Sequence, residues 1–206
     1  MIFLYIKDYI FDRDADVERD VAYAMLDTAY GMKFNTPTPV TLKNEYGKPY
    51  FADGSCHFSI SHGKGLCAVL LTDEGECGVD IEPEIEENRA RKIDTRYLSD
   101  GLPVHPIDGV VELKTELSGQ AKTDLSGQLQ TVAEMKIQPV EAESFDEMPI
   151  TAKWTVLEAV LKMSGEGFAA GYSRRLEIAD TASTKTLVFK GEEKTFYVTL
   201  AIKTAR

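Results

Sequence analysis

The feature that most constrains the fold is a run of three strand-like segments between residues 57 and 82. Residues 57–61 alternate apolar and polar side chains, which predicts a strand with one face against a core. Residues 66–71, with the sequence LCAVLL, are continuously apolar and predict a strand that is buried on both faces. Residues 75–82 follow the turn-forming sequence TDEG, and this close spacing predicts hairpins between successive strands.

An amphipathic helix is predicted before this run, over residues 14–32. Its apolar side chains recur at fourfold spacing, which places them on one helical face. Asp14 or Asp16 can cap its start, and Gly31 can end it in the left-handed conformation. The face predicted for burial comprises Val17, Val21, Met25, Leu26 and Ala29.

Two more helices are predicted after the run. The first covers residues 83–98, begins at Pro83, and has its acidic residues first and its basic residues last, as the helix dipole favours. The second covers residues 151–163, with Thr151 as its cap and Gly165 in its exit. Its predicted apolar stripe comprises Trp154, Leu157, Val160 and Leu161.

The remaining segments complete an α+β prediction. Residues 2–6 form a short predicted strand, and residues 176–180, 186–190 and 195–203 form three more. Residues 100–148 are polar and contain the near-repeat TELSGQAK and TDLSGQLQ, for which we expect a hairpin or an extended excursion. Clusters of strands that each carry one or two helices are typical of an α+β protein.

The charge balance argues against one class of partner. The 206 residues include 23 basic and 34 acidic side chains, a net charge of −11. Nucleic-acid binding rests on a basic face that meets phosphates, so we expect no nucleic-acid partner. A small anion held in a local pocket stays compatible with this charge.

The chain carries no pattern of a targeting or membrane-spanning segment. The apolar N-terminal residues are interrupted by Lys7 and Asp8, and no later stretch approaches 18 apolar residues. We therefore expect a cytoplasmic protein without a membrane partner. Cys56, Cys67 and Cys77 match neither a zinc nor a disulfide spacing and are expected to be buried.

Two carboxylates share one face of the predicted strand GVDIE. Val79 and Ile81 point to one side, and Asp80 and Glu82 point to the other. Carboxylates near a core are rarely buried unless they are paired or bind a metal, and hard oxygen ligands suit Mg²⁺. The alternative is an edge strand with a solvated face.

A second pair of charged residues lies on the helix at 151–163. Glu158 and Lys162 are four residues apart and are therefore neighbours on one helical face. They can form an exposed ion pair, or Glu158 can be a third metal ligand with Lys162 beside a phosphate. Lys48, next to Pro49, and His62, after a predicted strand, are further candidates for anion contacts.

Taken in order, these motifs resemble the 4′-phosphopantetheinyl transferases, and in particular their longer, pseudo-dimeric type. The matching segments are Gly47-Lys48-Pro49, Phe58-Ser59-Ile60-Ser61-His62, Gly78-Val79-Asp80-Ile81-Glu82, Trp154 through Lys162, and Gly165-Glu166-Gly167. The resemblance covers residues 45–82 and 151–168 well and the rest only by position.

The resemblance implies a particular fold. It consists of two similar α+β halves related by a pseudo-twofold axis, with coenzyme A in the cleft between them. The halves would be residues 1–76, which are short for this family, and residues 77–206. Together they would form one structural unit, and such a duplicated chain would act as a monomer.

The resemblance also implies a reaction and its residues. Coenzyme A would donate its 4′-phosphopantetheine arm to a serine of an apo-carrier protein, and 3′,5′-ADP would leave. Mg²⁺ would be held by Asp80, Glu82 and Glu158, and Lys162 would steady a phosphate or the serine oxygen. The nucleotide end would be held by Lys48, Ser61 and His62. The base would be Glu158 or a metal-bound water.

The carrier protein, acyl or peptidyl, would dock on a basic group. That group comprises Arg89, Arg91, Lys92 and Arg96, which otherwise serve the helix dipole as solvated charges. The chain departs from the family at Leu157, where a lysine is usual, and lacks a glutamate after Tyr97. Lys33, Lys43 or Lys64 could replace missing coenzyme contacts. These departures motivate an alternative, a non-catalytic relative that binds coenzyme A or a carrier.

Overall fold

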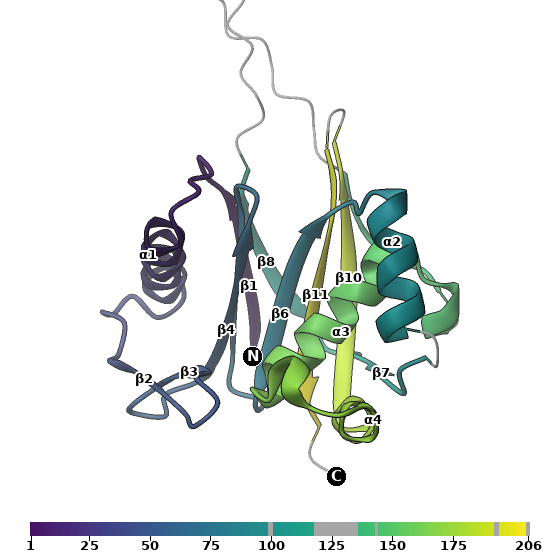
Figure 1. Cartoon of the computed structure of the whole chain (residues 1–206). Helices are drawn as coiled ribbons and strands as arrows, with labels where there is room; N and C mark the ends of the chain where they lie inside the picture. The colour runs from purple at the N-terminus through teal and green to yellow at the C-terminus, as the bar shows by residue number, and fades with distance from the viewer. Residues whose placement is uncertain (99–100, 118–135, 143, 192–193, 205–206) are drawn as a thin grey trace, which may run out of the picture.

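Two β-sheets lie face to face, and helices cover the outer side of each (Figure 1). The computed structural model describes residues 1–98, 101–117, 136–142, 144–191 and 194–204. Runs of consecutive strands are separated by groups of helices along this part of the chain, an order that is typical of the α+β class and confirms it. The hairpin or extended excursion is expected for residues 100–148, of which residues 118–135, with most of the near-repeat, lie outside the described residues. The described strands on either side of that gap join different sheets.

The first sheet has the strand order β4-β5-β1-β8. Its strands are β1 (Ile2–Asp8), β4 (His57–Gly63), β5 (Leu66–Thr72) and β8 (Val111–Glu116). β5 pairs antiparallel with β4 and with β1, whereas β8 pairs parallel with β1. Helix α1 (Ala15–Phe34) covers its outer face, where one apolar cluster forms. The expected strand at the N-terminus is thus confirmed, and so is the full burial of LCAVLL.

The second sheet runs β6-β11-β10, with two short strands beside β10. Its members are β6 (Cys77–Pro83), β7 (His105–Pro106), β9 (Lys136–Pro139), β10 (Ala182–Lys190) and β11 (Thr195–Lys203). β11 pairs antiparallel with both β6 and β10. The two strands predicted near the C-terminus are confirmed as β10 and β11.

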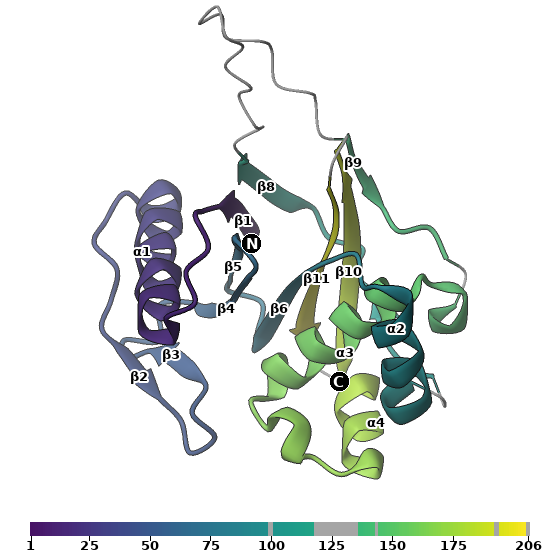
Figure 2. The ribbon, with the colours of Figure 1, turned by 45° about the horizontal axis from the view of Figure 1, so that its top comes forward.

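Helices cover the outer face of the second sheet, opposite α1 (Figure 2). They are α2 (Glu87–Ile93), which continues as a π-helix (Asp94–Leu98), α3 (Ile150–Ser164) and α4 (Tyr172–Asp180). Single 3-10 turns occur at Phe145–Glu147 and Gly167–Ala169, and strands β2 (Thr41–Lys43) and β3 (Pro49–Phe51) form a separate ribbon. No helix of the described residues is long and apolar enough to cross a membrane.

The facing sides of the sheets share one apolar core. Leu4 of β1, Leu70 of β5, Val79 of β6 and Val198 of β11 belong to it, and each is shielded completely from solvent. Strand alternation sends every second side chain into this core and the others toward the covering helices. The core therefore joins the two sheets into one packed body.

The predicted hairpin between β5 and β6 is wrong, whereas the hairpin between β4 and β5 is confirmed. β6 leaves the first sheet and pairs with β11 of the second. The turn signal between β5 and β6 is real, but a short turn also permits a change of sheet. The apolar side of β6 faces the shared core in either arrangement, so local sequence did not distinguish them.

Several helix boundaries differ from the prediction. Residues 176–180 belong to α4 and not to a strand, because Ile178 and Ala179 pack as a helical pair against the α3 side of the second sheet. Pro83 ends β6, and α2 begins only at Glu87. The first error arises because a short segment fits either a period of two or of 3.6 residues, and the second because proline fits the end of an edge strand as well as the first turn of a helix.

Helix α1 keeps its predicted N-cap, and its predicted face is turned inward except at Val17. The Asp14 carboxylate accepts a hydrogen bond from the Asp16 backbone N–H, as expected. Val17 is 43% exposed, whereas Glu18 is buried. The helix runs past Gly31 and ends at the left-handed Asn35. Of the other predicted residues, Met25, Leu26 and Ala29 are buried and Val21 is partly buried.

Helix α3 approaches β6 more closely than a side chain permits. A β-carbon at Gly78 would lie 1.9 Å from the Ala159 carbonyl oxygen and 2.5 Å from the Met163 amide nitrogen. Glycine at position 78 is therefore a packing requirement of this contact. The predicted apolar stripe of α3 is buried, whereas Thr151 accepts a hydrogen bond from the Ile85 N–H and does not cap the helix.

Gly78→Ala is expected to lower the free energy of unfolding by about 2–3 kcal/mol, because α3 must shift away from β6. Urea unfolding followed by circular dichroism measures this loss. Gly63→Ala, at a strand glycine with open space around it, is the matched control and should leave the stability equal or slightly higher. Equal stabilities for both variants would contradict the close-packing argument.

Candidate functional site

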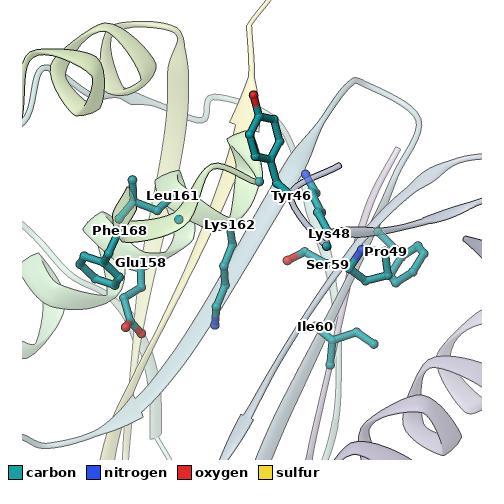
Figure 3. Close-up of a pocket in the computed structure, with 13 residues that line it drawn as sticks. Tyr46, Lys48, Pro49, Ser59, Ile60, Glu158, Leu161, Lys162 and Phe168 are labelled. Atoms are coloured by element: carbon teal, nitrogen blue, oxygen red, sulfur yellow. The ribbon is translucent and has the colours of Figure 1, made fainter. Parts of the chain in front are cut away.

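Strand β6 and helix α3 bring Asp80, Glu158 and Lys162 together. Asp80 is only 2% exposed. The Lys162 Nζ donates a hydrogen bond to the Asp80 Oδ1 at 2.7 Å. Glu158 lies one turn before Lys162, on the same side of α3 (Figure 3). The expected pair of residues on one helical face is therefore turned toward the carboxylates of β6 and is not a solvated surface pair.

Two cavities meet at this cluster. The smaller, of about 130 Å³, lies between the ends of β4 and β6 and is lined by Ser61, His62, Gly63, Lys64, Asp80, Ile81, Glu82, Pro83, Glu158 and Lys162. The larger, of about 330 Å³, lies between the β3–β4 region and α3 (Figure 3). Glu158 and Lys162 line both cavities, so these two side chains stand at their junction.

The pKa of Glu158 is raised to about 8. Burial is the largest cause, followed by the neighbouring Asp80 carboxylate, and Lys162 opposes the shift. The carboxyl group therefore carries a proton through most of the neutral range when no further cation is present. An added positive charge would favour its ionised form.

The donor set of this cluster suits a hard cation. The Asp80 Oδ2 is buried and receives no hydrogen bond from an N–H or hydroxyl group of the described residues, so once Glu158 is ionised this oxygen is available to a ligand. The Glu82 carboxylate instead lies 3.4 Å from the Lys64 Nζ and 3.6 Å from a terminal nitrogen of Arg89. Within the described ranges, no three His, Cys, Asp or Glu side chains are gathered into a metal-binding group. The set Asp80, Glu82 and Glu158 stays a prediction.

The Lys48 ammonium group hydrogen-bonds to two backbone carbonyls of the chain. The Nζ donates to the Met163 carbonyl at 2.5 Å and to the Cys77 carbonyl at 3.0 Å. Burial lowers the pKa of Lys48. Its side chain also lies against Gly165, whose left-handed backbone and lack of a β-carbon permit that contact. Lys48 thus ties β6 and the end of α3 to the β2–β3 turn, while it lines the larger cavity.

His62 has an acidic neighbour that the sequence did not reveal. Its Nδ1 lies 3.8 Å from the Glu18 Oε2, and Glu18 is 7% exposed. Glu18 also accepts hydrogen bonds from the Tyr9 hydroxyl and, at 2.9 Å, from the Asp12 N–H. The signal available in the sequence was an acidic residue one position away from the predicted apolar face of α1. This carboxylate opposes an anion at His62 unless the imidazole is protonated.

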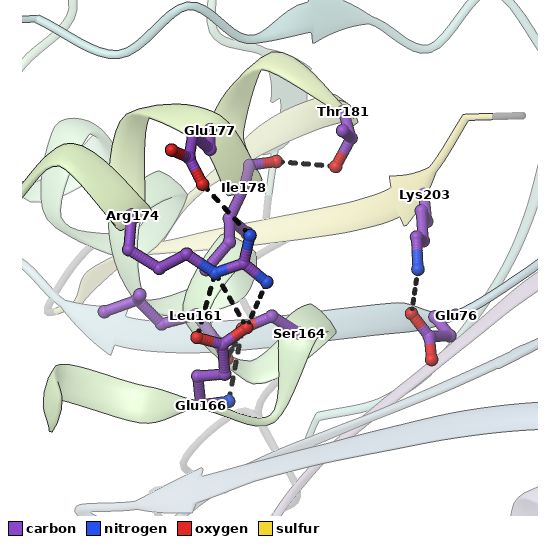
Figure 4. Close-up of polar contacts among 9 residues, drawn as sticks. All are labelled: Glu76, Leu161, Ser164, Glu166, Arg174, Glu177, Ile178, Thr181 and Lys203. Atoms are coloured by element: carbon purple, nitrogen blue, oxygen red, sulfur yellow. Dashed lines mark hydrogen bonds and ion pairs between the residues drawn. The ribbon is translucent and has the colours of Figure 1, made fainter. Parts of the chain in front are cut away.

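The turn after α3 is held by an ion pair. Arg174 of α4 donates to the Glu166 carboxylate, with the shortest contact at 2.6 Å (Figure 4). Gly165 and Gly167 flank Glu166, and both have left-handed backbones. Phe168 follows this turn, stacks on Trp154, and is 41% exposed at the rim of the larger cavity.

The basic group predicted for docking is exposed on α2 and its π-helical extension. All four side chains, of Arg89, Arg91, Lys92 and Arg96, face solvent. Arg91 pairs with Glu87 at 2.7 Å, and Arg89 pairs with Glu82, which lines the smaller cavity. Of the lysines considered as replacements, Lys64 lies at this cavity, whereas Lys33 pairs with Glu112.

Leu157, where the family usually has lysine, is buried in the core beneath α3. The segment after Tyr97 that lacks the glutamate includes residues 99–100, which lie outside the described residues. Cys56, Cys67 and Cys77 are free and buried, as expected.

Part of the chain is similar to proteins named 4′-phosphopantetheinyl transferase AcpT. Those of Salmonella typhi, Salmonella typhimurium and Escherichia coli strain K12 are each 46% identical to this chain over 48 residues. This stretch makes up 23% of the chain and spans only 25% of each relative's length. No protein-family model matches the chain. The similarity supports a relationship to phosphopantetheinyl transferases through one short segment.

Glu158→Gln is expected to flatten the pH dependence of stability in the metal-free protein. Between the unfolded pKa near 4.5 and the folded pKa of about 8, the native state holds the extra proton, so the wild-type free energy of unfolding falls as pH rises. The variant lacks this fall, which we place on the order of 1–2 kcal/mol. Urea unfolding in chelator at several pH values measures it, with Glu177→Gln as the exposed control. Parallel curves for Glu158→Gln and wild type would refute the assignment.

Lys48→Met is expected to lower the free energy of unfolding by about 1–3 kcal/mol, because two carbonyls lose a charged donor. Lys190→Met, at an exposed lysine at the end of β10, is the matched control and should change it by less than about 0.5 kcal/mol. Denaturant unfolding and calorimetric coenzyme A titration are measured on both variants. Unchanged stability with lost coenzyme binding would make Lys48 a ligand contact and not a structural tie.

Proposed function

We propose that this chain transfers the 4′-phosphopantetheine arm of coenzyme A to a serine of an apo-carrier protein, acyl or peptidyl, in a Mg²⁺-dependent reaction. The observation that supports the proposal best is the convergence of Asp80, Glu158 and Lys162 from β6 and α3. The short similarity to 4′-phosphopantetheinyl transferases points the same way. The geometry alone would also suit other phosphoryl transfers, so the named substrate rests on the resemblance.

The proposed reaction displaces one oxygen at phosphorus by another. A bond forms between the serine Oγ and the phosphorus that carries the pantetheine arm. The bond from this phosphorus to the bridging oxygen of the pyrophosphate breaks, and 3′,5′-ADP leaves with that oxygen. The serine proton passes to a base, and we propose Glu158 for this role in the ionised form that a bound cation would favour.

The carboxylates and Lys162 would act together on the phosphates. Asp80, Glu82 and Glu158 are the residues proposed to hold Mg²⁺, which would offset phosphate charge and stabilise the leaving group. Lys162, whose ammonium lies between Ser61 and Asp80, supplies a positive charge at the junction of the two cavities. Because a pyrophosphate repels an incoming oxygen, these positive charges lower the barrier to attack.

The larger cavity is proposed to hold the part of coenzyme A other than its phosphates. Its volume of about 330 Å³ falls at the lower end of the range for small-molecule sites. Tyr46 and Phe168 provide aromatic surface on opposite sides of it (Figure 3). His62 and Lys64 in the smaller cavity are the proposed contacts for the 3′-phosphate of coenzyme A.

The exposed bases of α2 are the proposed docking site for the carrier protein. Arg89 links this group to the smaller cavity through Glu82. A positive patch beside the site would speed the encounter with an acidic partner despite the net charge of −11.

We further propose the pseudo-dimeric arrangement of the longer transferases, with halves at 1–76 and 77–206. The order β4-β5-β1 in the first sheet matches the order β10-β11-β6 in the second, with antiparallel pairing throughout. In each case the first strand of the half pairs with its last strand. This equivalence supports a pseudo-twofold axis, although β8 of the second half extends the first sheet.

A second candidate function is that of a non-catalytic binding relative. Three observations favour it: Leu157 is buried where a cation is usual, Lys48 is bonded to backbone, and Glu18 faces His62. Each reduces the positive charge available to coenzyme A. Calorimetric binding of coenzyme A without transfer to any carrier would favour this candidate, and absence of both would exclude both functions.

The transfer proposal predicts that apo-carrier proteins gain the mass of the pantetheine arm when incubated with the chain, coenzyme A and Mg²⁺. Asp80→Ala should lower the rate on the order of 100-fold or more, because an oxygen ligand to the cation is lost. Glu177→Ala, which removes an exposed carboxylate paired with Arg174, is the control and should keep the wild-type rate. Mass spectrometry provides the readout, and full activity of Asp80→Ala would rule out the metal assignment.

A further inference from the structure

Ser61 lies among Asp80, Glu158 and Lys162, whereas the resemblance assigns it to the nucleotide end of coenzyme A. It is a residue of β4 and is only 4% exposed. Its Oγ donates to the Asp80 Oδ1 at 2.9 Å, accepts from the Lys162 Nζ at 2.8 Å, and accepts from the Ile81 N–H at 3.3 Å. This single hydroxyl thus hydrogen-bonds to the backbone of β6, to a lysine of α3 and to the Asp80 carboxylate.

The hydrogen-bond inventory of a hydroxyl fixes the direction of its proton. A serine hydroxyl has one donor and two acceptor lone pairs. The Lys162 ammonium and the Ile81 N–H can only donate, so they take both lone pairs. The hydroxyl proton is therefore directed to Asp80, and every hydrogen-bonding capacity of Ser61 is used.

These bonds give the two oxygens of Asp80 different environments. Oδ1 accepts from both Ser61 and Lys162, whereas Oδ2 is buried and receives no hydrogen bond from an N–H or hydroxyl group in the described part of the chain. The Glu158 carboxyl, which hydrogen-bonds to Asp80 while it is protonated, is the other neighbour of this carboxylate. Two donors on one oxygen fix the carboxylate plane. Oδ2 is then the atom left to meet a cation at the smaller cavity, which Asp80 lines.

We propose that Ser61 is a positioning residue that orients Asp80 for cation binding, and that it is not a contact of the coenzyme. This inference rests on the proposed function, because it concerns the cation that the carboxylates are proposed to hold. Residues that hydrogen-bond to a metal ligand fix its orientation, and their loss weakens metal affinity about 10- to 100-fold.

The chain offers a matched control two residues away. Ser59 is also on β4, is 6% exposed, and its Oγ accepts from the Val79 N–H of β6 at 3.0 Å. Ser59 and Ser61 therefore make the same type of link from β4 to the β6 backbone. Of these two links, the one from Ser61 also includes Asp80. A purely structural role would make their substitutions equivalent.

The test measures Mn²⁺ binding to the full chain by electron paramagnetic resonance, without coenzyme A. Ser61→Ala should weaken Mn²⁺ affinity about 10-fold, and Ser59→Ala should leave it within about twofold of wild type. Ser61→Thr keeps the hydroxyl and should restore most of the affinity. If Ser61→Ala does not fold, Ser61→Cys replaces it with the same expected direction, because a thiol is a weak donor. Coenzyme A affinity is measured in parallel by calorimetry.

The outcomes separate this inference from the proposed function. Equal Mn²⁺ affinity of Ser61→Ala and wild type overturns the inference, while carrier modification by the wild type would still support the transferase. Unchanged Mn²⁺ affinity with weakened coenzyme A binding makes Ser61 a coenzyme contact and also overturns it. A wild-type chain that binds no Mn²⁺ overturns both the inference and the metal-dependent reaction.

Discussion

The close contact of α3 with β6 at Gly78 is the constraint on which the site depends. With no side chain at this position, the helix backbone at Ala159 and Met163 lies directly against the strand. Asp80 is two residues further along β6, and Glu158 and Lys162 flank the contact on α3. A larger residue at position 78 would separate the carboxylate of the strand from the charged groups of the helix. Close packing therefore explains the glycine of the GVDIE motif. The same packing brings the acidic residues of this motif next to the charged residues of α3.

The first half of the chain contributes polar links more than charged ligands. Ser59 and Ser61 bond to the backbone of β6, and Lys48 bonds to the ends of β6 and α3. The two sheets share an apolar core, but such a core alone fixes neither register nor orientation along the strands. Directional bonds from the edge of the first sheet fix how it meets the second. Residues that the resemblance places on coenzyme A thus have structural partners in this chain.

The elements that were predicted correctly are those with strong local patterns. The strand with two acids on one face and the amphipathic helix α3 follow from side-chain period, and the strand LCAVLL follows from its continuous apolar run between turn signals. The errors lie in short segments, such as residues 176–180, and in the choice of sheet for β6. Glu18 was not predicted as a neighbour of the site, because only the folded chain places it beside Tyr9 and His62.

The sequence by itself determined which residues carry charge and which strand and helix present it. It placed Asp80 with Glu82, and Glu158 with Lys162, because neighbours two apart on a strand or four apart on a helix share a face. Only the tertiary structure decided that these pairs face each other, that Ser61 bonds to Asp80, and that Lys48 bonds to backbone carbonyls. The reason is physical: Ser61 and Lys162 are 101 residues apart, and Lys48 and Met163 are 115 apart. Such contacts follow from how sheets and helices pack, which no local period encodes.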